Sequence, residues 1–271
     1  MDIFKLVKKS LGADAFSIGK SACGNDILCV HRGSMRGNQI IITAAIHARE
    51  CYTALVVLEQ SRAFDKATAV GGVYFVPLVN PDGALFFDSG ETFGRAFLRE
   101  HAHEREMWKA NADGVDLNCN FDANFGTGAQ NKFVRGASDY VGEYPFCAPE
   151  TRALAAFTSR VSPSMTVSYH CMGGELYWEF FQSGAARERD RKIADAVAAH
   201  IGVKRVDGDL CSAGGYKDWC VQKFGIPAVT VELIRGGNHP FYADAYAADI
   251  AANARLPEYI LEILRELDQK K

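Results

Sequence analysis

Three apolar segments of this sequence run directly into side chains that could bind a metal ion. The first ends in His47 and Glu50, spaced H-x-x-E, the second ends in His170, and the third leads into Glu232. Two imidazoles and one carboxylate, with a fourth position left to water, are the usual ligands of a hydrolytic zinc site. We therefore predict that His47, Glu50 and His170 hold one zinc ion per chain.

Glu232 is the predicted general base of the same site. Zinc polarises a carbonyl and acidifies water, but a nearby carboxylate must still accept the proton and pass it on. Each pattern is weak alone, because H-x-x-E occurs by chance and a single histidine at a strand end is often a hydrogen-bonded core residue. Their joint placement at three strand ends favours a shared site.

The elements that must position these side chains read as an α/β fold. Short β-branched apolar runs alternate with helical patterns, as in a sheet buried on both faces, and ligands of such sheets bind beyond the carboxyl ends of strands. We predict one domain over residues 1–271, with a twisted, mixed, mostly parallel central sheet, helices on both faces, and long functional loops at 88–144. The predicted strands are 26–31, 39–46, 72–79, 165–170 and 228–233. The predicted helices are 50–64, 148–161, 185–201 and a tail at 242–271 that is interrupted at Pro257.

Composition excludes several classes of protein. The 271 residues carry a formal net charge of -3, which leaves no broad basic field for nucleic acid. No apolar run approaches the roughly 20 residues that cross a bilayer. The first residues lack the pattern of a secretory signal, and the eight cysteines contain no C-x-x-C pair, so a cytoplasmic protein with reduced thiols is expected.

Further segments resemble the zinc metallocarboxypeptidase family, in which H-x-x-E, G-V-D-x-N, a strand-end His and a strand-borne Glu recur in this order. The matching segments are I-H-A-R-E (46–50), V-N-P-D-G (79–83), G-V-D-L-N (114–118), S-Y-H (168–170), G-G-Y-K-D-W (214–219) and T-V-E-L (230–233). They span roughly residues 15–265. The resemblance implies a carboxypeptidase-like α/β fold with one catalytic zinc, the same three ligands and the same base.

The resemblance also implies roles for residues around the metal. Asp116 corresponds to the carboxylate that orients the first zinc-bound histidine, although an aspartate there could also simply form a turn. Asn118 corresponds to the residue that binds the terminal carboxylate of the substrate. Arg49 would lie at the rim near the bound peptide.

The sequence departs from the family at three positions that contact substrate. Cys119 stands where an arginine usually pairs with the terminal carboxylate of the substrate, a geometry that only guanidinium supplies. Either another cation serves, or a different group is recognised, or the usual activity is lost. Leu210 occupies the place of a tyrosine that closes over substrate, and the nearby Tyr216 is a second candidate contact at a different position. Lys109 is the nearest candidate for a carbonyl-polarising cation, with a solvated surface lysine as the alternative.

Lys217 falls where the family sets its preference for the side chain of the released residue, so we expect an acidic group there. The segments W-K-A-N, S-A-G-G-Y-K-D-W and N-H-P are most similar to bacterial members that act on murein peptides and cut the bond between γ-D-glutamate and a diamino acid. Such substrates carry extra carboxylates, which suits both Lys217 and the change at Cys119. Recycling of imported murein peptides would suit a cytoplasmic enzyme.

The predicted activity is therefore zinc-dependent release of a C-terminal amino acid or diamino acid from a small peptide. A general carboxypeptidase or a deacylase of acyl-amino acids is the alternative within the enzymes. A zinc-containing binding or regulatory protein, which lost turnover with the missing arginine, is the alternative of another class. Cys119 could also join the metal or respond to oxidation, since thiolates are good zinc ligands.

Overall fold

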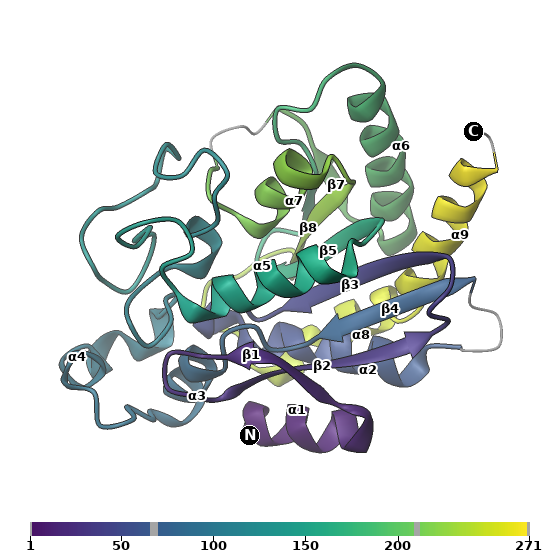
Figure 1. The fold of residues 1–271 in the computed structure, drawn as a ribbon. Coiled ribbons are helices and arrows are strands. Elements are labelled where there is room, and N and C mark those ends of the chain that lie inside the picture. Colours follow the sequence, from purple (N-terminus) through teal and green to yellow (C-terminus); the bar gives the residue numbers. More distant parts are fainter. Residues whose placement is uncertain (1, 66–69, 209–211, 270–271) are drawn as a thin grey trace.

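The computed structural model describes residues 2–65, 70–208 and 212–269. Within these ranges the strands form one sheet with the order β1-β2-β4-β3-β5-β8-β6-β7 (Figure 1). The strands are β1 (Phe16–Lys20), β2 (Asp26–Gly33), β3 (Asn38–Ala44), β4 (Gly71–Val76), β5 (Met165–Cys171), β6 (Glu175–Tyr177), β7 (Lys204–Val206) and β8 (Ala228–Leu233). The central strands β4, β3, β5 and β8 are parallel, whereas β1–β2, β2–β4 and β6–β8 pair antiparallel. The predicted mixed α/β sheet is confirmed.

Helices cover both faces of the sheet. The α-helices of the described residues are α1 (Ile3–Leu11), α2 (Ala54–Ala63), α3 (Pro81–Ser89), α4 (Ala96–Glu100), α5 (Pro149–Val161), α6 (Gly184–Ile201), α7 (Tyr216–Phe224), α8 (Ala247–Asn253) and α9 (Leu256–Asp268). In β3, Ile40 and Ile42 belong to the apolar cluster that includes α1, α2, α6 and α9, whereas Ile41 belongs to the cluster under α5 and α7. Because successive strand residues point to opposite faces, this alternation explains why the strand reads as a continuous apolar run.

The predicted elements differ from the observed ones mainly at their ends. The predicted strand 39–46 stops at Ala44, because Ala45 adopts a φ of 53° and turns the chain out of the sheet. The predicted helix 50–64 begins as the 3-10 helix η2 (Ala48–Thr53) and becomes α-helical at Ala54. The tail divides into α8 and α9, with Pro257 in the first turn of α9, so the predicted interruption is confirmed.

Several elements were not predicted. The strands β6 and β7 have three residues each, which is too short for a periodic pattern, and α3 and α7 begin inside segments that read as motifs. The segment 88–144 consists of loops interrupted by α4 and the short helices η3 (Ala102–Met107) and η4 (Leu117–Cys119), and it forms the rim at the left of Figure 1. Long loops in this segment were expected.

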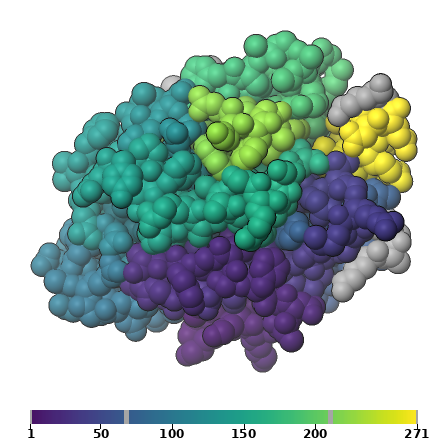
Figure 2. Space-filling view, in the orientation of Figure 1, coloured from purple at the N-terminus to yellow at the C-terminus, as the bar shows by residue number. Residues whose placement is uncertain are grey.

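The hairpin β1–β2 packs closely under α5, and Figure 2 shows the two elements in contact across the visible face. A Cβ at position 19 would lie only 2.4 Å from the Cβ of Ala153, so glycine allows strand and helix to approach. Among the described residues, no helix combines the length and the apolar character that crossing a membrane requires.

Candidate metal centre

The three segments that carry the predicted site end side by side. Strands β3, β5 and β8 are parallel neighbours, so their carboxyl ends lie at one edge of the sheet. Register places Ala44 of β3 beside Tyr169 of β5, and His170 of β5 beside Glu232 of β8. His47 follows the end of β3 by one turn, which brings residues far apart in the chain to one place.

The turn after β3 is hydrogen-bonded to the loop rim, the segment 88–144. Ala45 leaves the sheet with a positive φ, and η2 follows directly. The backbone N–H groups of Ala48 and Arg49 donate to the carbonyls of Lys109 and Trp108, at 3.0 and 2.8 Å. These bonds explain why a tight 3-10 turn forms here, and the turn places the two outer side chains of H-x-x-E on one side.

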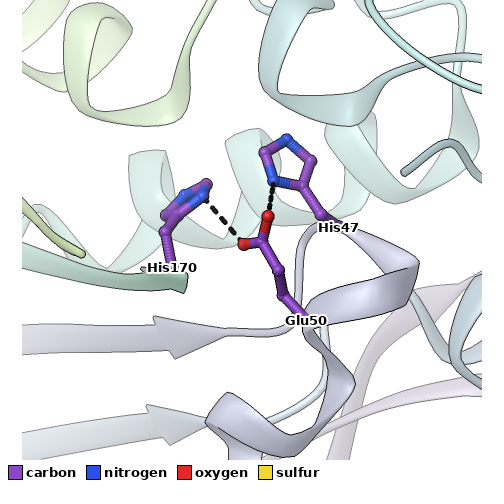
Figure 3. Close-up of side chains that lie close together, drawn as sticks. All are labelled: His47, Glu50 and His170. Atoms are coloured by element: carbon purple, nitrogen blue, oxygen red, sulfur yellow. Dashed lines mark hydrogen bonds and ion pairs between the residues drawn. The ribbon is translucent and has the colours of Figure 1, made fainter. Parts of the chain in front are cut away.

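The side chains of His47, Glu50 and His170 converge in the interior (Figure 3). Nδ1 of His47 lies 2.9 Å from Oε1 of Glu50, and Nδ1 of His170 lies 3.3 Å from Oε2. One donor atom from each residue lies within 4.8 Å of the other two, and all three residues are buried. The backbone N–H of Cys171 also donates to Oε2 at 3.2 Å, which ties η2 to β5.

This donor set fits a zinc ion. Two imidazole nitrogens and a carboxylate are the protein ligands of many catalytic zinc sites, which keep a further position open. Nε2 of His47 faces Oδ1 of Asp116 at 3.2 Å, so a proton on Nε2 would leave the lone pair of Nδ1 directed at the cluster. The arrangement therefore provides two nitrogen donors, one oxygen donor and a carboxylate beside the first imidazole.

Electrostatics links the buried groups of this cluster. Burial lowers the pKa of His47, but the charges of Glu50 and Asp116 outweigh burial and raise that pKa to about 9. Burial opposes ionisation of Glu50, yet the neighbouring His47 and His170 hold its pKa well below the usual range. Burial lowers the pKa of His170. The cluster is thus stabilised by charge, as a site for a cation requires.

Glu232 lies beside this cluster and is partly buried. Burial, reinforced by the negative charge of Glu50, raises the pKa of Glu232 to about 8. The carboxylate form of Glu232 becomes favoured when a divalent cation shares the site. A carboxyl group whose pKa lies near neutrality, next to a metal site, suits a group that accepts and returns a proton.

Lys109 is paired with two carboxylates on the far side of Asp116. Its Nζ lies 3.1 Å from Oδ2 of Asp116 and 2.9 Å from Oδ1 of Asp139, and the N–H of Asp139 donates to Oδ2 of Asp116. Burial opposes the charge on Lys109, but these two carboxylates raise its pKa above the usual range. The structure therefore places Lys109 as a partly buried, ion-paired support of Asp116 and not as a solvated surface lysine.

Two polar cavities open beside the cluster and share Asn118 and Ser212. The Lys217 cavity has a volume of about 180 Å³ and is lined by Asn118, Tyr177, Ser212, Gly215, Lys217, Asp218, Thr230 and Glu232. The Cys119 cavity has a volume of about 250 Å³ and is lined by His47, Lys109, Asn118, Cys119, Gly128, Ala129, Gln130, Asn131, Asp139, Ser212 and Ala213. The predicted substrate contacts Asn118, Cys119 and Lys217 thus reach space next to Glu232 and His47.

Tyr216 is not in either cavity, and its predicted contact with substrate is not supported. Its ring is 1% exposed and packs against Phe121 and Trp219. Its hydroxyl lies 2.8 Å from Oγ1 of Thr158, which directs the side chain into the core under α5. Tyr216 therefore anchors the start of α7, and its backbone N–H donates to Oδ1 of Asn118.

The remaining predicted contacts have mixed positions. Arg49 is partly buried, and its Nε is a buried donor without a partner among the described residues. Leu210 lies outside the described residues. Burial raises the pKa of the Cys119 thiol, and Cys119 lies outside the cluster of potential ligands among the described residues. Gly214 packs directly against the backbone of Cys119. A Cβ at position 214 would lie 2.4 Å from the Cys119 carbonyl oxygen.

Sequence reasoning missed two acidic residues of the site. Asp139 lies in the loop rim and shows no periodicity or motif, so only its contact with Lys109 identifies it. Asp218 belongs to the matched segment G-G-Y-K-D-W, but its pairing with Lys217 was not foreseen. Adjacent opposite charges in a sequence were the available signal for that pair.

The sheet and the cluster together define a metallohydrolase of the zinc carboxypeptidase architecture. The chain matches the zinc carboxypeptidase family, Peptidase M14, over residues 10–256, and it belongs to that family of zinc peptidases. This agrees with the resemblance drawn from the motifs.

One curated relative and two solved structures illustrate what the chain is similar to. The chain is 28% identical over 245 residues to gamma-D-glutamyl-L-diamino acid endopeptidase 1 of Lysinibacillus sphaericus, covering 82% of this chain and 60% of that relative. Murein-tripeptide amidase MpaA from Escherichia coli O157 superposes with a TM-score of 0.65 at 21% identity, covering 92% and 94% of the two chains. Carboxypeptidase A from Helicoverpa armigera superposes with a TM-score of 0.76 at 17% identity, covering 99% and 72%. The chain thus spans less than two thirds of the length of the Lysinibacillus relative.

Proposed function

We propose that this chain hydrolyses the bond between γ-D-glutamate and a diamino acid in small peptides derived from murein. The observation that carries the proposal is the convergence of His47, Glu50 and His170 next to Glu232, with two polar cavities alongside. Membership of the zinc carboxypeptidase family supports peptide hydrolysis. The activities after which the Lysinibacillus and Escherichia proteins are named support a murein peptide as the substrate.

Each residue of the metal centre has a separate role in the proposed reaction. His47, Glu50 and His170 would hold zinc, and Asp116 keeps the His47 imidazole oriented. Zinc, when bound, supplies a Lewis acid that polarises the substrate carbonyl and makes water more acidic. Glu232 accepts the proton of the attacking water and returns it to the nitrogen of the released residue.

The Cys119 cavity bears on how the carboxylates of the substrate are recognised. A neutral thiol stands where recognition of a terminal carboxylate by guanidinium would be expected, and Lys109 on the same cavity is already paired with Asp116 and Asp139. Amide groups of Asn118 and Asn131 line the remaining wall. A murein tripeptide also ends in a free carboxylate, so the comparison of linkages, and not this cavity, separates the proposed activity from that of a general carboxypeptidase.

The first test compares peptides that differ in the scissile linkage. Zinc-loaded protein should release diaminopimelate from L-Ala-γ-D-Glu-meso-diaminopimelate, with products identified by mass spectrometry. The same tripeptide with an α-linked L-glutamate, and ordinary dipeptides, should be cleaved at least about 10-fold more slowly. A ten-fold difference in rate corresponds to about 1.4 kcal/mol of transition-state binding. Equal or faster cleavage of the ordinary peptides would establish a general carboxypeptidase instead.

Glu232→Gln tests the proposed base. We expect kcat to fall by roughly 10²- to 10⁴-fold, because an amide cannot accept the proton. Zinc content, measured by atomic emission, should stay at one per chain. The control Glu262→Gln changes an exposed glutamate on α9 and should leave kcat unaltered. A wild-type protein that binds zinc but cleaves no member of the panel would support a binding or regulatory protein.

Recycling of murein peptides in the cytoplasm stays a prediction. Fractionation of cells that produce the full-length tagged protein would test it, and recovery outside the cytoplasm would contradict it.

A further inference from the structure

Lys217 and Asp218 form an ion pair on the wall of the Lys217 cavity. Nζ of Lys217 lies 2.5 Å from Oδ1 of Asp218, and both residues are buried. Buried pairs of this kind contribute little net stability, because the loss of hydration offsets most of the attraction. A pair that borders the proposed catalytic base therefore suggests a role in recognition.

The pair is held rigidly but keeps one donor unused. Nζ of Lys217 also donates to the carbonyl of Glu179 at 2.8 Å, and an ammonium group has three N–H donors. Oδ2 of Asp218 accepts from the N–H of Gly215 at 3.2 Å and from the hydroxyl of Ser212 at 3.3 Å. No third hydrogen-bond acceptor of Lys217 occurs among the described residues, and its Nζ also lies 5.5 Å from the centroid of the Phe180 ring. Asp218 is fixed at the first turn of α7.

The charged groups that line the cavity favour a side chain that carries both an acidic and a basic group. Lys217 and Asp218 cancel, and Glu232 adds a further carboxyl group. A purely anionic side chain would gain contact with Lys217 but would approach two carboxyl groups. A purely cationic side chain could approach Asp218, but it would also approach the ammonium group of Lys217 and would offer no acceptor to its remaining N–H. A group that carries one carboxylate and one ammonium matches both members of the pair.

We propose that the Lys217 cavity binds the distal end of the released diamino acid, where a carboxylate and an ammonium share one carbon. The carboxylate contacts Lys217 and the ammonium faces Asp218. The volume of about 180 Å³ equals roughly six water molecules, which suits a long side chain with a polar end. This proposal rests on the proposed function and revises the expectation of a simply acidic group.

The test uses three peptides that differ only at the distal end of the last residue. L-Ala-γ-D-Glu followed by meso-diaminopimelate carries both groups, L-lysine lacks the carboxylate, and L-2-aminopimelate lacks the ammonium. We expect kcat/KM to fall at least 10-fold when either group is missing, mainly through a higher KM. Equal kcat/KM for all three would overturn the inference and leave the proposed function intact. Cleavage of none would overturn the proposed function and the inference with it.

Variants of Lys217 test whether the Lys217–Asp218 pair causes the preference for diaminopimelate. In Lys217→Met the preference for diaminopimelate over lysine, measured as the ratio of the two kcat/KM values, should drop to within 2-fold. Lys217→Met/Asp218→Asn avoids an unpaired aspartate and should behave likewise if the single variant unfolds. The control Lys223→Met alters an exposed lysine of the same helix and should keep the full preference. A preference retained in both Lys217 variants would contradict the assignment.

Discussion

The role inferred for Lys109 changes once its neighbours in the structure are known. In the sequence it follows a tryptophan and is the nearest candidate for a cation that polarises the substrate carbonyl. In the structure its ammonium group lies between Asp116 and Asp139, with its side chain 17% exposed. We therefore interpret Lys109 as a positioning residue that keeps Asp116 ionised behind His47.

Replacing Lys109 by methionine tests this interpretation. The variant should lose about 3 kcal/mol of unfolding free energy, because the fully buried Asp116 would lose its lysine partner next to the charge of Asp139. Urea denaturation measures the change, and Lys109→Met/Asp139→Asn should recover part of it. Lys132→Met removes the other lysine that pairs with Asp139. The Lys132 side chain is 57% exposed, so its loss should cost under about 1 kcal/mol of unfolding free energy. Unchanged stability with lost activity in Lys109→Met would favour the carbonyl-polarising role.

At the scale of elements, Glu150 joins three parts of the chain. It lies in the first turn of α5, and Oε1 accepts from the backbone N–H of Ala22 in the β1–β2 turn at 2.9 Å. Oε2 accepts from Nδ2 of Asn111 in the loop rim, also at 2.9 Å. Burial raises the pKa of Glu150 to about 7, against these hydrogen bonds.

This raised pKa predicts a pH-dependent stability. The folded protein holds the Glu150 proton more tightly than the unfolded chain, so the stabilising contribution is complete below about pH 4.5 and disappears as pH rises to about 7. The free energy of unfolding of the wild type, minus that of Glu150→Gln, should fall by about 3 kcal/mol across this window. Other groups titrate alike in both proteins and cancel. A difference that stays flat from pH 5 to 8 would contradict the prediction.

The strands of the central sheet were predictable and its edges were not. Segments such as 165–170 and 228–233 are continuous β-branched runs, because helices cover both of their faces. The edge strands β6 and β7 are three residues long and gain their identity only by pairing with a neighbour. Single-sequence periodicity carries no signal for such short elements.

At the scale of the whole molecule, the metal site exists only in the folded chain. His47 and Glu50 come from the turn after β3, whereas His170 comes from β5. A metal that binds only the folded state stabilises it by mass action. That residues 1–271 form a single catalytic domain stays a prediction.

Zinc should therefore raise the melting temperature. At free zinc about 1,000-fold above its dissociation constant, the gain in unfolding free energy is about 4 kcal/mol. Differential scanning calorimetry with zinc and with a chelator measures the shift, which His170→Ala should largely abolish. Cys119→Ala should keep the full shift, because Cys119 lies outside the cluster of donor atoms. A reduced zinc shift in Cys119→Ala would assign the thiol to the metal.

The sequence by itself determined the candidate ligands, their order and the strands that carry them, because donor types and apolar periodicity are local properties. Only the tertiary structure decided that Lys109 is neutralised by Asp116 and Asp139, that Tyr216 lies in the core, and that Lys217 is paired with Asp218. The physical reason is that the charge and accessibility of a side chain depend on the groups that surround it. Those groups come largely from segments that meet only when the sheet and its loop rim assemble.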